Sequence, residues 1–147
     1  MRLNTISLFT GCGGLDLGFR SSGFNIVLIN DSWDKAIETY QINHTKSDYE
    51  VISGDITKKE ISERIITSSK KQKIDLIIGG PPCQEFSSAG ERKANGLKAN
   101  LTPQFAELVC QIQPKWVVME NVNTLVSIGD QQLKKCKDIF QKNGYGI

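Results

Sequence analysis

The stretch Ile74–Gly90, with the sequence IDLIIGGPPCQEFSSAG, decides the fold class that the chain predicts. Its first five residues, Ile74–Ile78, carry a single charge and run into two glycines, which is typical of a central strand of a parallel sheet. Pro81 and Pro82 then fix two successive φ angles, so Cys83 follows in a stiff bend. Because open α/β sheets bind ligands at the carboxyl ends of their strands, this pattern favours a cysteine nucleophile at a crevice. The alternative is a buried, inert cysteine in a turn.

The composition narrows the class of protein. A chain of 147 residues is long enough for one domain with its own core, and 23% charged with 39% hydrophobic residues is ordinary for a globular protein. No run approaches the ~18 apolar residues of a membrane span, and the N-terminus lacks the cationic and apolar regions of a signal peptide. The four cysteines are widely spaced without a CxxC pair, which predicts free thiols in a reducing cytoplasm and no metal site. The net charge of +2 is too small to indicate nucleic-acid binding by itself.

Strands and helices alternate along the chain. The predicted strands cover Thr5–Phe9, Asn25–Asn30, Tyr49–Ser53, Ile74–Ile78 and Trp116–Met119. The predicted helices cover Leu15–Ser22, Asp34–Asn43, Lys58–Ser69, Thr102–Ile112 and Gln131–Asn143. After Cys83, the stretch Glu85–Asn100 has no long apolar period and predicts a mobile loop. This rhythm predicts an α/β fold with a doubly wound, mostly parallel sheet.

A glycine-rich turn connects the first strand to the first helix. The sequence SLFTGCGGLDLGF, residues 7–19, places Gly11, Gly13 and Gly14 there. Glycines at that point permit a tight turn and a close approach of backbone to a ligand at a helix N-terminus. The spacing G-x-G-G differs from the G-x-G-x-x-G of dinucleotide-binding proteins, so it disfavours NAD and leaves a nucleoside ligand open.

Three carboxylates follow strands of the predicted sheet. Asp31 ends the second strand, near where an acidic residue takes ribose hydroxyls. Asp55, with Ile56 beside it, follows the third strand and could accept from an adenine amino group or could cap the next helix. Glu120 follows the fifth strand, and if that strand neighbours the one before Cys83, the two residues share a crevice. Partial desolvation there would let Glu120 act as a proton donor, whereas the alternative is an ion-paired or helix-capping glutamate.

Three ordered motifs, SLFTGCGGLDLGF, GGPPCQEFS and MENV, with GDI between the first two, carry a specific resemblance. Together they resemble the N-terminal part of a DNA (cytosine-5) methyltransferase, especially the bacterial restriction-modification type. The resemblance runs from about Leu3 to Gly144. It implies a Rossmann-like methyltransferase fold truncated before its last strands, with residues 1–147 forming the N-terminal part of the catalytic domain and no target-recognition domain.

The resemblance also implies a role for each matching residue. The implied S-adenosyl-L-methionine site comprises Phe9, Gly11, Gly13, Gly14, Leu15, Asp31, Asp55, Ile56, Pro81 and Leu101, with Asp31 at the ribose and Asp55 and Ile56 at the adenine. Cys83 matches the nucleophile, and Glu120 matches the residue that engages nitrogen 3 and the exocyclic amine of cytosine. The family often has an aromatic residue directly after the ribose acid. Here Ser32 comes first and Trp33 second, so which of them takes the adenine-stacking position stays open.

The implied reaction methylates carbon 5 of cytosine through a covalent adduct with Cys83. The cytosine must first flip out of double-stranded DNA, and Gln84–Asn100 would close over it. Later segments of the family, including target recognition, do not appear in this sequence, so we expect a fragment or one subunit that needs a second polypeptide or a C-terminal region. The alternatives are a catalytically silent binding or regulatory module, and a fragment of a tRNA cytosine-5 methyltransferase.

Overall fold

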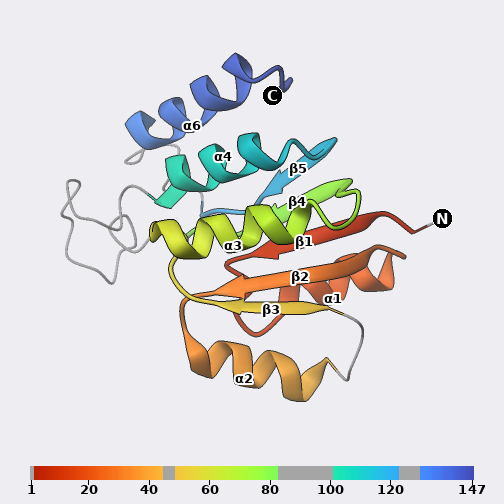
Figure 1. Cartoon of the computed structure of the whole chain (residues 1–147). Coiled ribbons are helices and arrows are strands. Elements are labelled where there is room, and N and C mark those ends of the chain that lie inside the picture. Colours follow the sequence, from red (N-terminus) through yellow and green to blue (C-terminus); the bar gives the residue numbers. More distant parts are fainter. Residues whose placement is uncertain (1, 45–48, 83–100, 123–129) are drawn as a thin grey trace.

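The computed structural model describes residues 2–44, 49–82, 101–122 and 130–147, which form a five-stranded sheet with helices on both faces (Figure 1). The strands are β1 (Asn4–Leu8), β2 (Asn25–Asp31), β3 (Glu50–Ser53), β4 (Leu76–Gly79) and β5 (Trp116–Met119). The helices are α1 (Gly14–Ser21), α2 (Asp34–Asn43), α3 (Lys59–Ser69), α4 (Leu101–Ile112) and α6 (Asp130–Lys142). Every pairing in the order β3-β2-β1-β4-β5 is parallel, which confirms the predicted fold class.

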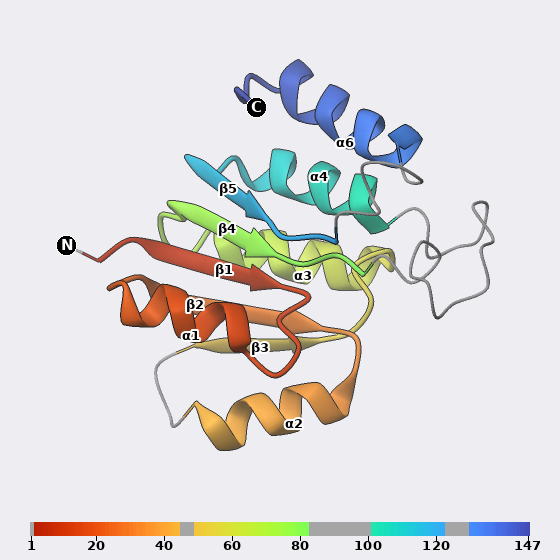
Figure 2. The same ribbon diagram turned by 180° about the vertical axis from the view of Figure 1, so that it is seen from behind.

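The helices divide between the two faces of the sheet. α1 and α2 cover one face, and α3, α4 and α6 lie on the other (Figures 1 and 2). The core beneath α3 and α4 includes Leu8, Ile65 and Phe105, and the core beneath α1 and α2 includes Ile37 and Ile78. Both faces are therefore covered, as parallel sheets require, and the carboxyl ends of the strands meet along one edge of the fold.

The structure corrects the predicted strands in two places. β4 spans Leu76–Gly79 rather than Ile74–Ile78, although the N–H of Asp75 still donates to the carbonyl of Asn4 at 2.9 Å just before it. β4 pairs with β1 on one side and with β5 on the other and is buried throughout, so it is an interior strand of the parallel sheet, as predicted. Phe9 has a φ of 53° and begins the glycine-rich turn instead of ending β1.

β5 forms an edge of the sheet within the described part of the chain. Trp116 and Val118 of this strand are 68% and 40% exposed. This edge therefore leaves part of its apolar surface uncovered by the described residues. In the described ranges, no helix combines the length and apolarity needed to cross a membrane, and no group of three or more His, Cys, Asp or Glu side chains could hold a metal ion.

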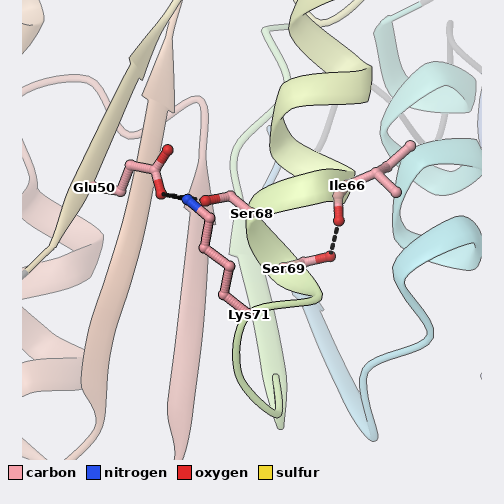
Figure 3. A network of polar contacts seen from close by, with 5 residues as sticks. All are labelled: Glu50, Ile66, Ser68, Ser69 and Lys71. Atoms are coloured by element: carbon pink, nitrogen blue, oxygen red, sulfur yellow. Dashed lines mark hydrogen bonds and ion pairs between the residues drawn. The ribbon is translucent and has the colours of Figure 1, made fainter.

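Glu50 ties the start of β3 to the end of α3 (Figure 3). Its Oε2 accepts hydrogen bonds from the hydroxyl of Ser68 and, at 3.3 Å, from the ammonium group of Lys71. The neighbouring Ser69 donates to the carbonyl of Ile66 at 2.8 Å. The hydrogen bond from Ser68, and to a smaller extent the contact with Lys71, lowers the pKa of Glu50 from its ordinary value.

A lowered pKa in the folded state makes this contact dependent on pH. The stabilisation is fully present above the unfolded pKa of ~4.3 and is lost as the pH falls through the lower folded value. We expect Glu50→Gln to reduce the free energy of unfolding at pH 7 by less than about 1 kcal/mol, because the Glu50 side chain is 41% exposed. The difference from the parent, measured by urea denaturation, should shrink as the pH is lowered below the unfolded pKa of the carboxyl group.

The control for this prediction is Glu63→Gln, whose side chain is 61% exposed and pairs with Lys59 within α3. It should change stability little over the same pH range. A deficit of Glu50→Gln that stays the same over this range would contradict the assignment.

Candidate functional site

A cavity of about 350 Å³ lies at the carboxyl ends of β1, β2, β3 and β4. It is lined by Phe9, Asn30, Asp31, Ser32, Trp33, Gly54, Asp55, Ile56, Gly80, Pro82 and Leu101. β1 lies between β2 and β4. Along the chain, strands are added on one side of β1 as β2 and β3, and then on its other side as β4 and β5, so the strand order reverses beside this cavity. Such switch points are where open α/β sheets bind ligands.

A second, larger hollow of about 530 Å³ lies between β5 and α6. Its lining includes Trp116, Val117, Leu133 and Phe140, and no Asp or Glu side chain among the described residues. It runs along the sheet edge, away from the strand ends that carry the predicted site residues. The smaller cavity is therefore the candidate site, because polar groups converge on it.

The glycine-rich turn is fixed to the end of β2. The N–H of Thr10 donates to the carbonyl of Asn30 at 3.1 Å, and the N–H of Gly13 donates to the carbonyl of Thr10 at 2.9 Å. Gly11 and Gly13 have φ angles of 54° and 87°, a region that glycine adopts without strain. The turn thus needs these glycines for its shape, and it leads directly into α1.

The carboxylate of Asp31 links the glycine-rich turn to the segment between β2 and α2. Its Oδ2 accepts the N–H of Gly11 at 2.8 Å, and its Oδ1 accepts the N–H of Trp33 at 2.9 Å. Each carboxylate oxygen keeps a second lone pair for a ligand, because a carboxylate offers about four acceptor sites. Asp31 therefore organises the cavity wall and still presents acceptors to it.

Asp55 has a local role as well. Its Oδ1 accepts the N–H of Thr57 at 2.9 Å, and its carbonyl accepts the N–H of Lys58 at 3.0 Å. The capping alternative is not realised, because the N-cap residue of α3 is Lys58 and the Asp55 side chain bonds to the turn before the helix. Ile56 is only 4% exposed and belongs to the core, so it contributes a small apolar face to the cavity.

Both residues after Asp31 line the cavity, but they differ in what they offer. Trp33 is 64% exposed, a large aromatic surface left uncovered by the described protein. Ser32 offers a hydroxyl and little apolar area. Sequence reasoning missed Asn30, whose Nδ2 donates to the carbonyls of Ile52 and Gly54 at 2.7 and 3.0 Å and joins β2 to β3. In the sequence, Asn30 could have been found as an amide side chain that follows the apolar residues Ile26–Ile29 near the end of the strand.

Glu120 and Asn121 face the end of β4. β4 and β5 are neighbours, so the condition set for a shared crevice is met. The Oε2 atom of Glu120 lies 3.1 Å from where a Cβ on Gly80 would be, and Asn121 Nδ2 donates to the carbonyl of Pro81 at 2.9 Å. Asn121, which sequence reasoning did not single out, thus holds the residue two before Cys83. Glu120 is exposed, so the expected desolvation is not provided by the described residues.

The predicted site residues divide into three groups. Phe9, Asp31, Asp55, Ile56 and Leu101 line the cavity. A second group does not line it and comprises Gly11, Gly13, Gly14, Leu15 and Pro81. The N–H of Gly11 donates to Asp31, Gly13 is buried, and Leu15 packs in the core under α1 and α2. Pro82 lines the cavity in place of Pro81. Cys83 and the predicted loop Glu85–Asn100 lie outside the described residues.

This chain is similar to known proteins in sequence and in fold. Type II methyltransferase M.HindV of Haemophilus influenzae is 45% identical over 151 residues, covering 99% of this chain and 45% of that relative. Type II methyltransferase M.HgiGI of Herpetosiphon aurantiacus is 47% identical over 120 residues, covering 82% of this chain and 90% of that relative. A solved structure described as a DNA modification methyltransferase of an E. coli prophage has a TM-score of 0.68 at 29% identity, covering 92% of this chain and 38% of that one.

The chain therefore spans less than half of M.HindV, at 45% of its length. A model of the family described as C-5 cytosine-specific DNA methylase matches residues 3–147, almost the whole chain. This match confirms the resemblance that the ordered motifs indicated, and the chain belongs to the C-5 cytosine-specific DNA methylase family.

Proposed function

We propose that this chain carries the cofactor site and the catalytic residues of a restriction-modification enzyme that methylates carbon 5 of cytosine in double-stranded DNA. The observation that carries the proposal is the cavity at the strand ends. It combines two carboxylates and an exposed tryptophan. The glycine-rich turn is bonded to one of these carboxylates, Asp31, and Glu120 with the Pro81–Pro82 bend lies beside the cavity.

The chemistry of the cavity fits S-adenosyl-L-methionine. Its volume of about 350 Å³ lies in the range of small-molecule sites, and its wall combines apolar and acidic groups. Asp31 would accept the ribose hydroxyls, Asp55 the adenine amino group, and Trp33 would stack on the adenine. When bound, this cofactor supplies a methyl group on a sulfonium centre.

The residues of the chain then have separate tasks in the reaction. The Cys83 thiolate bonds to carbon 6 of cytosine while Glu120 supplies a proton to nitrogen 3, which makes carbon 5 nucleophilic. Once carbon 5 carries the methyl group, its proton would pass to a solvent base. The electrons of that C–H bond would form the carbon 5–carbon 6 double bond and expel Cys83 as a thiolate, and nitrogen 3 would return its proton to Glu120, which restores the base. Asn121 holds the Pro81 carbonyl and so positions the bend that delivers Cys83.

The DNA must be presented to this site with its cytosine flipped out of the stack. Base recognition requires side chains that reach the groove edges. We propose that these come from segments that the relatives carry in addition to the part matched here, either in a C-terminal region or in a second polypeptide. The 45% coverage of M.HindV supports this proposal.

Tryptophan fluorescence tests the cofactor assignment, because the chain has two tryptophans, Trp33 in the cavity wall and Trp116 at the sheet edge. Titration with S-adenosylhomocysteine should quench the emission of Trp33 as the adenine stacks on it. Trp33→Phe should abolish most of this signal, and Trp33→Ala should weaken binding roughly fivefold, in line with the ~1 kcal/mol of an aromatic stack.

Trp116→Phe is the matched control and should keep both the quenching and the affinity. Quenching that survives in Trp33→Phe and is lost in Trp116→Phe would place the ligand at the wrong tryptophan. Binding of NADH with no response to S-adenosylhomocysteine would refute the cofactor.

A further inference from the structure

Asp16 is a fully buried carboxylate directly below the glycine-rich turn, with an exposed fraction of 0%. Three hydroxyl groups donate to it: Ser7 to Oδ1 at 2.6 Å, Thr10 to Oδ2 at 3.0 Å, and Tyr40 to Oδ2 at 2.8 Å. These donors come from β1, from the turn itself and from α2. One side chain on α1 therefore joins three parts of the fold that meet at the cofactor turn.

Both ends of the turn depend on this carboxylate. Thr10 is held by its hydroxyl, and its carbonyl accepts the N–H of Gly13. Gly13 in turn rests on the ring of Tyr40, since a Cβ added to Gly13 would lie 2.6 Å from Cδ2 of that ring. The position of the ring is set by the bond from its hydroxyl to Asp16.

Tyr40 is suited to remain a donor in this arrangement. Burial, and then the neighbouring Asp16 carboxylate, raise the pKa of Tyr40 well above its usual range, so the phenol keeps its proton. The guanidinium group of Arg20 donates to the same hydroxyl oxygen at 3.3 Å and lies over the ring of Tyr49 at 5.4 Å. The cationic Arg20 thus reaches the buried carboxylate of Asp16 through one intervening group, the hydroxyl of Tyr40.

We propose that Asp16 is a positioning residue for the cofactor, which holds Thr10 and Gly13 in the geometry that S-adenosyl-L-methionine binds without touching the cofactor itself. This inference rests on the proposed function, because it assigns the turn to that cofactor. The apolar clusters on both faces of the sheet are built from other residues, so the fold has support that is independent of Asp16.

Two variants separate positioning from general stability. Asp16→Asn keeps the shape but puts a donor where hydroxyl groups donate. Tyr40→Phe keeps the ring beneath Gly13 while removing the hydrogen bond donated to Asp16 and the one accepted from Arg20. Affinity for S-adenosylhomocysteine should fall roughly tenfold in Asp16→Asn and roughly threefold in Tyr40→Phe, as expected for loss of charge-assisted hydrogen bonds. Calorimetric titration is done at a temperature where circular dichroism shows each variant folded.

Amide hydrogen exchange of the ligand-free protein gives a second readout that a general loss of stability would not move selectively. The N–H groups of Gly11 and Gly13 should exchange faster in both variants, while those of Leu76–Gly79 in β4 keep the parent rate. Tyr145→Phe is the matched control, because it also removes a partly buried phenol bond, from Tyr145 to the carbonyl of Pro114 at 2.7 Å, but packs in the core cluster on the other face of the sheet. Its affinity should stay within about twofold of the parent, since a single neutral hydrogen bond away from the turn is lost.

The outcomes distinguish this inference from the proposed function. If the parent binds S-adenosylhomocysteine and folded Tyr40→Phe and Asp16→Asn bind it equally well, Asp16 is structural only and the inference is wrong. If the parent does not bind it at all, the proposed cofactor is wrong. If Asp16→Asn fails to fold, Tyr40→Phe decides the question by the same measurements.

Discussion

Replacement of Cys83 by alanine is expected to abolish methyl transfer, with a loss of at least about a thousandfold, because the proposed function gives the bond to carbon 6 of cytosine to the thiolate of this residue. The assay uses the form of the enzyme that methylates DNA, with radiolabelled S-adenosylmethionine. A second measurement uses DNA that contains 5-fluorocytosine at the target. Fluorine cannot leave as a proton does, so the parent enzyme should remain covalently attached and Cys83→Ala should not.

Cys110→Ala provides the control for this prediction. Cys110 is buried near α6 with its sulfur 4.0 Å from the carbonyl of Ile139, and burial raises the pKa of its thiol, which makes the reactive thiolate scarce. This variant should lose some stability and still form the adduct. An adduct that persists in Cys83→Ala would exclude Cys83 as the nucleophile.

Gly13→Ala is expected to be the most destabilising change in the glycine-rich turn. A side chain at a φ of 87° costs ~1–2 kcal/mol, and its overlap with the His44 ring and with the Tyr40 ring at 2.6 Å adds ~1–3 kcal/mol. The free energy of unfolding from chemical denaturation should therefore fall by roughly 2–5 kcal/mol. Cofactor affinity should fall with it, because the ring beneath the turn must move.

Two neighbouring glycines complete this series. Gly11 has a φ of 54° with open space around it, so Gly11→Ala should cost only the backbone strain of ~1–2 kcal/mol. Gly14 begins α1 with no atom within 4 Å of an added Cβ, so Gly14→Ala should leave stability unchanged or raise it by up to ~1 kcal/mol. Equal losses in Gly13→Ala and Gly14→Ala would show that the turn has a different shape.

Much of the fold could be predicted from local patterns alone. Alternating apolar runs and helical periods indicated the parallel sheet, and α2 and β5 have the predicted bounds. Gly23 and Gly144 end helices at φ angles of 90° and 86°, a conformation that glycine adopts without a steric penalty. These features follow from neighbouring residues, so a single sequence contains the information for them.

The tertiary structure decided which distant residues meet. The sequence determined that Asp31, Asp55 and Glu120 follow strands, but only the order β3-β2-β1-β4-β5 determines which strand ends share a cavity. Asp16 illustrates the limit, because its position in a short amphipathic helix suggested nothing unusual. Its burial depends on Tyr40, 24 residues away, whose hydroxyl reaches it only after α1 and α2 have packed on the same face of the sheet. A buried charge is tolerated only where such partners converge, and that convergence is a property of the packed fold rather than of any stretch of sequence.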